Sequence, residues 1–357
     1  MGTRALAANS PKEKTENIRT MEDFAAHIGL SRPTVSKYFN DPSSVREKTR
    51  KKIEQAISAS GFRPNLFAVN LKRQRTRILG VIIPNAIDPF YMELTRRIEE
   101  IANEAGYFAI VLSSNGNPEL EAEAIERFES MNVAGAIVAP LGQAQGQTKL
   151  DSLASRVPLI YVDAPGHEGI PYIGTDNRQS IGLIVDYLCR SGTPPCFLGM
   201  PEVNLNARLR RQAYEGAMAR AGHEPNVLTI PTSRDWDFEK FAHQQVSALL
   251  ASGLPTSTLL CANDRLAFGA LLAAWEAGIR VGHGRDCALR IAGHDDHPLA
   301  RYACPPLTTV AQDYAEIARL ATNRLLVMLD EKAPASTAEA SDEAVLLKAS
   351  IMLRASA

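Results

Sequence analysis

The first sixty residues place apolar side chains at the spacing of short helices. Phe24, Ala25 and Ile28 fall on one helical face, which predicts a helix that packs on its neighbours. Thr20 precedes this face and Asp23 follows three positions later, the pattern of a capping box that starts a helix. Gly29 then supplies the permissive backbone of a tight turn.

A second helix is expected to open directly after this turn. Ser31 is suited to the N-cap and Pro33 to the first turn, and Val35 and Phe39 are spaced to point back at the first helix. A third helix is expected at about residues 46–60, ending at Gly61. It directs Val45, Ile53, Ala56 and Ile57 to the core and leaves Lys48, Arg50, Lys51 and Lys52 outside.

Two short helices joined by a tight turn form a helix-turn-helix unit. The outward positions at the start of the second helix are Arg32, Pro33, Ser36 and Lys37. A recognition helix presents this end to the major groove of DNA. Taken singly, each of these side chains is equally an ordinary solvated residue.

After residue 77 the pattern changes: short apolar runs typical of strands alternate with amphipathic helix patterns. The helix after the first strand is expected at about residues 90–105. This alternation is typical of a parallel α/β fold. The chain length suits a small module followed by a large bilobed one. The expected strands are residues 78–83, 107–112, 136–139, 159–162, 259–262 and 289–292.

Charge divides the chain at the same place. The net charge is −1, but residues 1–77 contain 16 Lys and Arg against 7 Asp and Glu, a net of +9, so the remainder carries −10. A cationic module on an acidic body suits a nucleic-acid binder, although a solvated basic tail has the same composition. No stretch resembles a membrane span or a secretory signal, so we expect a cytoplasmic, nucleoid-associated protein.

Five cysteines without a CxxC pair argue against a disulfide framework and a zinc site. Nucleophile-elbow, P-loop, zinc-protease and dinucleotide-binding motifs are missing as well. His294 and His297 flank Asp295 and Asp296, but such loops are more often solvated turns than catalytic sites. We therefore expect no enzyme, and neither a metal nor another cofactor.

The chain resembles the LacI/GalR family of bacterial repressors. The resemblance rests on residues 21–25, on Gly29-Leu30-Ser31-Arg32-Pro33-Thr34-Val35-Ser36-Lys37-Tyr38-Phe39-Asn40, and on residues 61–65, and it extends from Thr20 to Arg354. Two departures, Pro33 and Arg46, affect which operator sequence is read. The resemblance implies DNA contacts from Thr20, Ser31, Arg32, Pro33, Thr34, Ser36, Lys37, Asn40, Thr49, Asn65, Ala68, Leu71 and Lys72.

The family's organisation implies a small all-α helix-turn-helix headpiece followed by an α/β bilobed, periplasmic-binding-protein-like domain with two parallel-sheet lobes. We expect a disordered segment at 1–17, the headpiece at 18–63, and a hinge helix and linker at 64–77. An effector-binding and dimerisation domain would occupy 78–357. Its first lobe takes about 78–175 and 306–335, and its second about 176–305 and 336–357.

The hinge at residues 64–72 is too short to form a stable isolated helix, because helix nucleation is costly. We expect it to order only on DNA. In similar repressors the residue matching Leu71 wedges between base steps in the minor groove. A plain linker with one buried leucine is the alternative interpretation.

Ligands of such sheets bind beyond the carboxyl ends of the strands. Side chains there that combine charged, amide and aromatic groups suit a polyhydroxylated ligand. Arg208 and Asp295 are expected to orient one sugar ring between the lobes. The candidate effector residues, which the resemblance supports position by position, are Asp88, Phe90, Asp163, Arg208, Trp236, Asn263, Asp295 and Gln312.

The prediction is a sequence-specific transcriptional regulator, most simply a repressor of carbohydrate-related genes. Its partners would be a pseudo-palindromic double-stranded DNA operator, a second copy of the chain in a homodimer, and a sugar, sugar phosphate or polyol effector. The C-terminal segment has no heptad pattern, so we do not expect a coiled-coil tetramer. Two alternatives stay open: a sugar-binding protein of a transport system, and a regulator with a non-sugar effector such as a purine.

Overall fold

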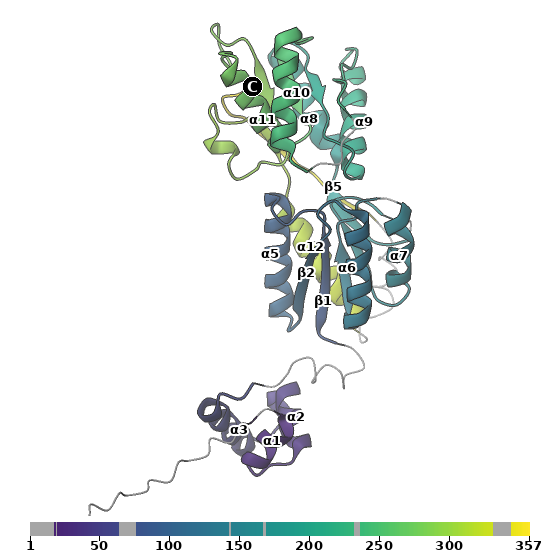
Figure 1. Ribbon diagram of the computed structural model, residues 1–357, viewed down its shortest axis with the longest axis vertical. Coiled ribbons are helices and arrows are strands. Elements are labelled where there is room, and N and C mark those ends of the chain that lie inside the picture. The colour runs from purple at the N-terminus through teal and green to yellow at the C-terminus, as the bar shows by residue number, and fades with distance from the viewer. Residues whose placement is uncertain are drawn as a thin grey trace, which may run out of the picture. The chain divides into compact units, whose positions relative to one another are not determined.

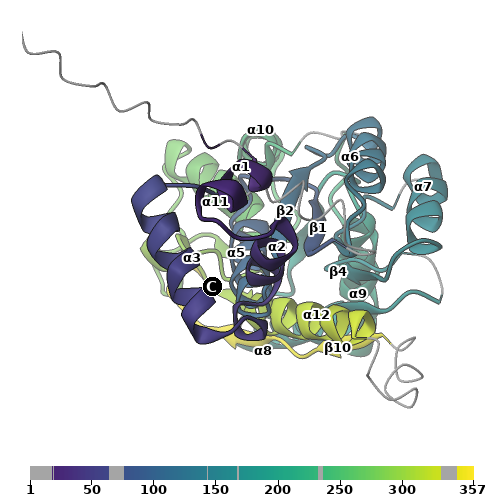
Figure 2. The same ribbon diagram turned by 90° about the horizontal axis from the view of Figure 1, so that it is seen from below.

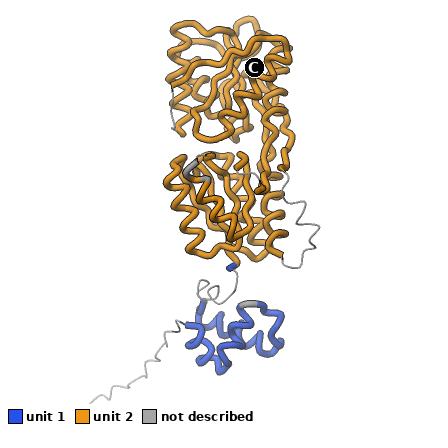
Figure 3. Tube along the Cα trace, turned by 90° about the vertical axis from the view of Figure 1, so that its right-hand side faces the viewer, with its two compact units in different colours: residues 1–76 blue, residues 77–357 orange. Residues whose placement is uncertain are grey.

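The computed structural model describes residues 18, 20–63, 76–142, 144–166, 169–231, 236–330 and 344–357. They belong to two compact units, residues 1–76 and 77–357 (Figure 3). The expected boundary, after residue 77, differs from this division by one position. The expected disordered segment at 1–17 and the hinge helix at 64–72 lie outside the described residues.

The headpiece contains the three expected helices, α1 (Met21–His27), α2 (Arg32–Asn40) and α3 (Glu47–Ser60), with a 3₁₀ turn, η1 (Pro42–Ser44), before α3. The capping box of α1 is confirmed: Asp23 N donates to Thr20 Oγ1 at 3.1 Å, and Thr20 N donates to Asp23 Oδ2 at 3.0 Å. Gly29 and Gly61 take positive φ angles of 60° and 64°, as the turn after α1 and the end of α3 require.

An aromatic cluster forms the headpiece core. Phe24 stacks on Phe62 with ring centroids 4.4 Å apart, and Val35 and Ile53 are fully buried beside them. Ser31 is the N-cap residue of α2, as expected, but its side chain makes no cap bond, because its hydroxyl pairs with Thr34 Oγ1 at 2.8 Å instead. The expectation for Val45 was wrong. Val45 is only half-buried and lies outside the core cluster.

The first lobe of residues 77–357 is built on a six-stranded parallel sheet with the strand order β10-β5-β4-β3-β1-β2. Helices α5 and α12 pack together on one face, and α6 and α7 on the other (Figures 1 and 2). The elements are β1 (Ile78–Ile83), α5 (Pro89–Glu104), β2 (Phe108–Ser113), α6 (Pro118–Met131), β3 (Gly135–Val138), α7 (Ala144–Ala154), β4 (Leu159–Val162), β5 (Tyr172–Thr175), α12 (Tyr314–Leu329) and β10 (Val345–Leu347).

Alternation along β1 decides which side chains meet which helices. Leu79 and Val81 belong to the core under α5 and α12, whereas Ile82 belongs to the core under α6. At Gly80 a Cβ atom would overlap the ring of Phe128, so glycine lets α6 lie directly on the sheet. Both faces of β1 are therefore buried, as expected for a parallel sheet.

The second lobe has a three-stranded parallel sheet in the order β6-β7-β8, with α8 packed on α9 and α10 on α11 (Figure 1). Isolated bridges join β8 and the loop after it to the region of β9, which pairs antiparallel with β11. The elements are α8 (Asn177–Ser191), β6 (Cys196–Leu198), α9 (Leu205–Arg220), α10 (Phe238–Ser252), β7 (Thr258–Cys261), α11 (Asp264–Glu276), β8 (Arg290–Ala292), η2 (Ala300–Tyr302), β9 (Thr309–Ala311) and β11 (Ser350–Met352).

The chain passes between the lobes after β5, after β9 and after β10. Two of the expected lobe limits were wrong, because β9 pairs within the second lobe and β10 pairs with β5 of the first. Gln179, which follows the crossing after β5, is hydrogen-bonded to Ala349 in the crossing after β10. Its Nε2 donates to Ala349 O at 3.1 Å, and its Oε1 accepts from Ala349 N at 2.9 Å. The expected bilobed, parallel-sheet fold is confirmed.

Candidate ligand cleft and headpiece surface

The carboxyl ends of strands from both lobes surround a small cavity of about 30 Å³. Seven of the eight effector residues expected from the sequence line it: Asp88, Phe90, Asp163, Trp236, Asn263, Asp295 and Gln312. The lining that sequence reasoning missed consists of Tyr91, Met200, Asn204, Asn206, Arg210 and Phe238.

Arg208 does not face this cavity, contrary to the sequence-based expectation. It is exposed and lines a separate depression beside Met200. Successive helical residues are about 100° apart, so Arg210 points to the other side of α9, into the lobe interface. The i, i+4 spacing of Asn206 and Arg210 puts them on one face of this helix, but Arg208 and Gln212 have the same spacing, so the sequence alone does not identify the inward face.

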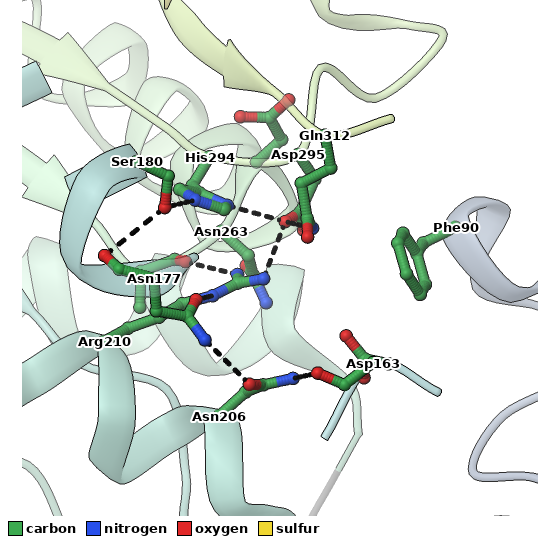
Figure 4. Close-up of polar contacts among 12 residues, drawn as sticks. Phe90, Asp163, Asn177, Ser180, Asn206, Arg210, Asn263, His294, Asp295 and Gln312 are labelled. Carbon is green, nitrogen blue, oxygen red and sulfur yellow. Dashed lines mark hydrogen bonds and ion pairs between the residues drawn. The ribbon is translucent and has the colours of Figure 1, made fainter. Parts of the chain in front are cut away.

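Arg210 is buried and forms an ion pair with Asp295 (Figure 4). Its Nη2 lies 3.0 Å from Asp295 Oδ1, Nη1 donates to Ala262 O at 2.8 Å, and Nε donates to Asn177 Oδ1 at 3.3 Å. These bonds use all three nitrogens of the guanidinium. The group is therefore fixed in place before any ligand arrives.

Asp295 is the centre of a wider network (Figure 4). Its Oδ1 also lies 2.9 Å from His294 Nδ1 and accepts from Gln312 Nε2 at 2.7 Å. Burial opposes ionisation of Asp295, but Arg210 and His294 outweigh burial and hold the pKa of this carboxyl below its ordinary value. The carboxylate is thus ionised, and Oδ2 has no hydrogen-bond partner among the described residues.

Burial, followed by the charge of Arg210, lowers the pKa of His294 to about 4. The imidazole is neutral at neutral pH, so Nδ1–H donates to Asp295 and Nε2 accepts from the Ser180 hydroxyl at 2.9 Å. Asp295 itself has a φ of 122°, a backbone conformation that side chains other than glycine rarely adopt. Strain of this kind is typical of functional sites.

The first lobe contributes a less compensated carboxyl group. Tyr91 OH donates to Asp163 Oδ2 at 2.7 Å, and burial raises the pKa of Asp163 to about 6. The Asp163 carbonyl accepts from Tyr172 OH at 2.9 Å and from Asn206 Nδ2 at 3.2 Å, the latter bond crossing between lobes. A second interlobe contact joins Arg265 Nη1 to Asp88 Oδ2 at 3.3 Å.

Aromatic rings close the cavity. Trp236 packs against Tyr91 and Phe238, with centroid distances of 6.4 and 5.4 Å. Two buried polar atoms of the lining, Trp236 Nε1 and Asn204 Oδ1, have no hydrogen-bond partner in the described part of the chain. An unpaired buried polar group costs free energy, so these atoms offer a ligand one donor and one acceptor.

The headpiece presents the expected DNA-facing positions on and around α2. Ser31, Arg32, Pro33 and Lys37 are exposed, as is Thr20, while Thr34, Ser36 and Thr49 are half-buried. Arg32 Nε pairs with Glu22 at 3.0 Å on the surface of the headpiece. The Asn40 side chain and all of Asn65, Ala68, Leu71 and Lys72 lie outside the described residues.

Within the described ranges, no three His, Cys, Asp or Glu side chains are grouped to hold a metal ion. No helix of this part of the chain is long and apolar enough to cross a membrane.

Known proteins match both units. Residues 20–65 match the family described as bacterial regulatory proteins, lacI family, and residues 185–356 match the periplasmic binding protein-like domain. The ribose operon repressor of Escherichia coli is 30% identical over 315 residues, which cover 87% of this chain and 92% of that protein. The E. coli transcriptional repressor CytR is 30% identical over 89% of this chain and 91% of its own.

A solved structure of the Lac repressor dimer bound to operator and an anti-inducer has the same fold. It superposes with a TM-score of 0.80 at 26% identity, over 95% of this chain and 98% of that one. A helix-turn-helix headpiece joined to a bilobed sensor domain defines a DNA-binding transcriptional regulator. The chain belongs to the lacI family of bacterial regulatory proteins.

Proposed function

We propose that the protein is a repressor of carbohydrate-related genes. It binds a pseudo-palindromic operator as a homodimer and is controlled by a small polyhydroxylated effector in the cleft between its lobes. The observation that carries this proposal is the fixed Arg210–Asp295 pair in the cavity of a chain that also presents an exposed recognition helix. A protein that acts on chromosomal DNA works in the cytoplasm.

The cleft chemistry supports a hydroxyl-rich ligand. The side chains of Asp88, Asp163 and Asp295 supply acceptors, and Asn263 and Gln312 supply amides. Trp236 and Phe90 supply flat apolar faces for the C–H groups of a sugar ring. Because Arg210 already pairs with Asp295, we favour a neutral sugar or polyol over a sugar phosphate.

Regulation would follow from closure of the lobes. A cavity of about 30 Å³ holds roughly one or two water molecules, so a sugar enters only after the lobes separate or the rings move. A ligand that contacts both walls changes the balance between open and closed states according to its differential affinity for them. That balance would set the spacing of two headpieces on DNA.

Exposed apolar side chains on both lobes fit a homodimer. Met92 of α5 and Phe108 of β2 are 55% and 66% exposed, and Trp275 of α11 is 75% exposed. Aromatic residues and methionine are enriched at the interfaces between protein subunits. Sedimentation of the Trp275→Glu variant should show monomer where the unaltered protein shows dimer, whereas no change would move the interface elsewhere.

The effector is tested by calorimetry with a panel of pentoses, hexoses, polyols, sugar phosphates and purines. We expect binding by a neutral polyhydroxylated compound, its loss in Asp295→Asn, and its retention in Arg208→Ala, the exposed neighbour of the cleft on α9. Binding of purines alone, or equal binding by both variants, would count against the carbohydrate assignment.

DNA binding is tested separately, by mobility shift with and without residues 1–77. Lys37→Ala should relax sequence discrimination, and Arg50→Ala should lower affinity for all sequences and flatten the salt dependence. Absence of operator binding by the full chain would favour the transport-protein alternative, and full operator affinity without residues 1–77 would place DNA binding outside the headpiece. The hinge assignment is checked with Leu71→Ala, which should weaken operator binding and spare effector binding.

A further inference from the structure

A second cavity lies where β5 and β10 of the first lobe meet α8 and α9 of the second. We propose that it is a separate binding site for a small anion that carries an apolar group. Its volume is about 440 Å³, within the range of small-molecule sites. None of its lining residues was predicted as a ligand contact from the sequence. We call it the hinge groove, because Thr175 and Asn177 of the first interlobe crossing line it.

Helix α9 separates the hinge groove from the cleft. Leu209, Ala213, Gly216 and Arg220 line the groove and follow one another at the spacing of a single helical face. Arg210, by contrast, lines the cleft. The floor of the groove is apolar, with Leu209 and Ala213 on α9, Pro165 after β4, and Leu346 on β10.

Two guanidinium groups border this apolar floor. Arg178 on α8 and Arg220 at the end of α9 are both exposed, and neither forms an ion pair with any residue the structure describes. Other arginines of the same helices are paired: Arg190 with Asp186 at 2.9 Å and Arg211 with Glu215 at 3.0 Å. No ion pair from the described part of the chain offsets these two positive charges, which favours an anionic occupant.

The Arg220 side chain lies along the two helices that border the groove. Its guanidinium passes Gly182 of α8 and Gly216 of α9, where an added Cβ atom would be 3.5 and 3.4 Å from its nitrogens, which is ordinary van der Waals contact. This position places the positive charge of Arg220 between α8 and α9, at the border of the groove.

A buried polar atom points to a ligand independently of the charges. Thr175 lines the groove and is 4% exposed, and its hydroxyl is buried with no hydrogen-bond partner within the described ranges. A hydroxyl that is buried without a partner destabilises the fold unless a bound group satisfies it. An anion oxygen held by the arginines would supply that acceptor.

The hinge groove is also connected to the cleft. Asn177 lines the groove, and its side chain accepts from Arg210 Nε at 3.3 Å and donates to Asn206 Oδ1 at 3.0 Å. Tyr172 lines the groove and donates to the Asp163 carbonyl at 2.9 Å. Occupancy of one site thus acts on residues that position groups in the other.

Calorimetry on the full chain tests the site with phenyl phosphate as the probe, compared with benzoate, inorganic phosphate and phenol. We expect one phenyl phosphate per chain, bound at least tenfold more tightly than phenol, which lacks the charge, or inorganic phosphate, which lacks the ring. Benzoate distinguishes a requirement for phosphate from a requirement for any anion: binding within tenfold of phenyl phosphate indicates a general anion site, and weaker binding a phosphate-selective one.

The double variant Arg178→Gln, Arg220→Gln should weaken phenyl phosphate binding at least tenfold. Gln212→Glu, a nearly isosteric change that adds a negative charge to the exposed lining, should weaken it as well. The matched control Arg190→Gln, an exposed arginine of α8 that does not line the groove, should bind normally. Equal binding by the double variant and the unaltered protein would overturn the proposal, as would equal weakening in Arg190→Gln.

Discussion

The two walls of the cleft hold their carboxylates in different ways. On the second lobe, Oδ1 of Asp295 is contacted by Arg210, His294 and Gln312, and the pKa of Asp295 lies below its ordinary value. On the first lobe, the only side chain among the described residues that donates to the Asp163 carboxyl group is the neutral Tyr91, and burial raises the pKa of Asp163 to about 6.

This difference indicates that the two lobes have different roles in binding a ligand. A carboxylate that is neutralised by a fixed cation keeps its charge and orientation without a ligand, so the second lobe is preorganised to bind first. A carboxylate without a cation depends on new partners, so the first lobe gains most from closure. Four predictions test this division, from the largest expected effect to the smallest.

Removing the cation of the second lobe should have the largest effect. Arg210→Met leaves the partly buried Asp295 carboxylate without a cation, and loss of one partner of a buried ion pair costs about 3–5 kcal/mol. Urea denaturation should show this loss, while Arg208→Met, an exposed site on the same helix, should change the unfolding free energy by less than about 0.5 kcal/mol. Similar losses in the two variants would show that the ion pair is not what organises this wall.

A second prediction concerns pH, because the second lobe also has a carboxyl group without a cation. Burial raises the pKa of Asp264 from 3.8 to about 8, while the group accepts from Thr309 Oγ1 at 2.6 Å and His297 N at 2.7 Å. Between these pKa values the folded protein keeps a proton that the unfolded chain releases. The unfolding free energy therefore falls as pH rises, by up to about 1.4 kcal/mol per pH unit.

The window from pH 6.5 to 8 isolates Asp264. Asp163, with a pKa of about 6, contributes mainly below this window, and His294, with a pKa lowered to about 4, contributes with the opposite sign between about 4 and 6.5. Urea denaturation from pH 6.5 to 8 should show the loss in the unaltered protein and in Asp163→Asn, but not in Asp264→Asn. A slope that persists in Asp264→Asn would assign it to another group.

The third prediction tests the aromatic contact between lobes. Gly116 has a φ of 70°, and a Cβ atom there would overlap the Trp236 indole. Gly169 has a φ of 85° and open space around it, so Gly169→Ala measures the backbone strain alone, about 1–2 kcal/mol. Gly116→Ala should cost about 1 kcal/mol more and shift the Trp236 emission in a Trp275→Phe background. Equal costs and unchanged emission would show that Trp236 moves freely.

The smallest effect is expected at the interlobe ion pair. Burial outweighs Arg265 and raises the pKa of Asp88, so the ionised pair contributes little net stability. Asp88→Asn keeps an N-cap acceptor for α5 and should change the unfolding free energy by less than about 1 kcal/mol, as should Asp313→Asn at the cap of α12. A loss above about 3 kcal/mol at Asp88 alone would make this pair the main latch between lobes.

The sequence by itself determined the local elements and the strand-end positions of the cleft. The Thr20 cap, the apolar face of α1 and the strands of the parallel sheets depend on residues a few positions apart, so periodicity and cap chemistry predicted them. Parallel strands end on the same edge of their sheet, and this rule placed Asp88, Asp163 and Asp295 around one cavity.

Only the tertiary structure decided which side chains turn inward and which short strands join which lobe. Arg208 and Arg210 are the same type of residue on the same helix, and only the packing of α9 directs Arg210 into the cleft. Strands β9 and β10 each have three residues, too few for a pattern to show that β9 pairs with β11 and β10 with β5. The physical reason is that strand pairing and burial of charge are interactions between residues far apart in the chain, whose energies exist only once the lobes have formed.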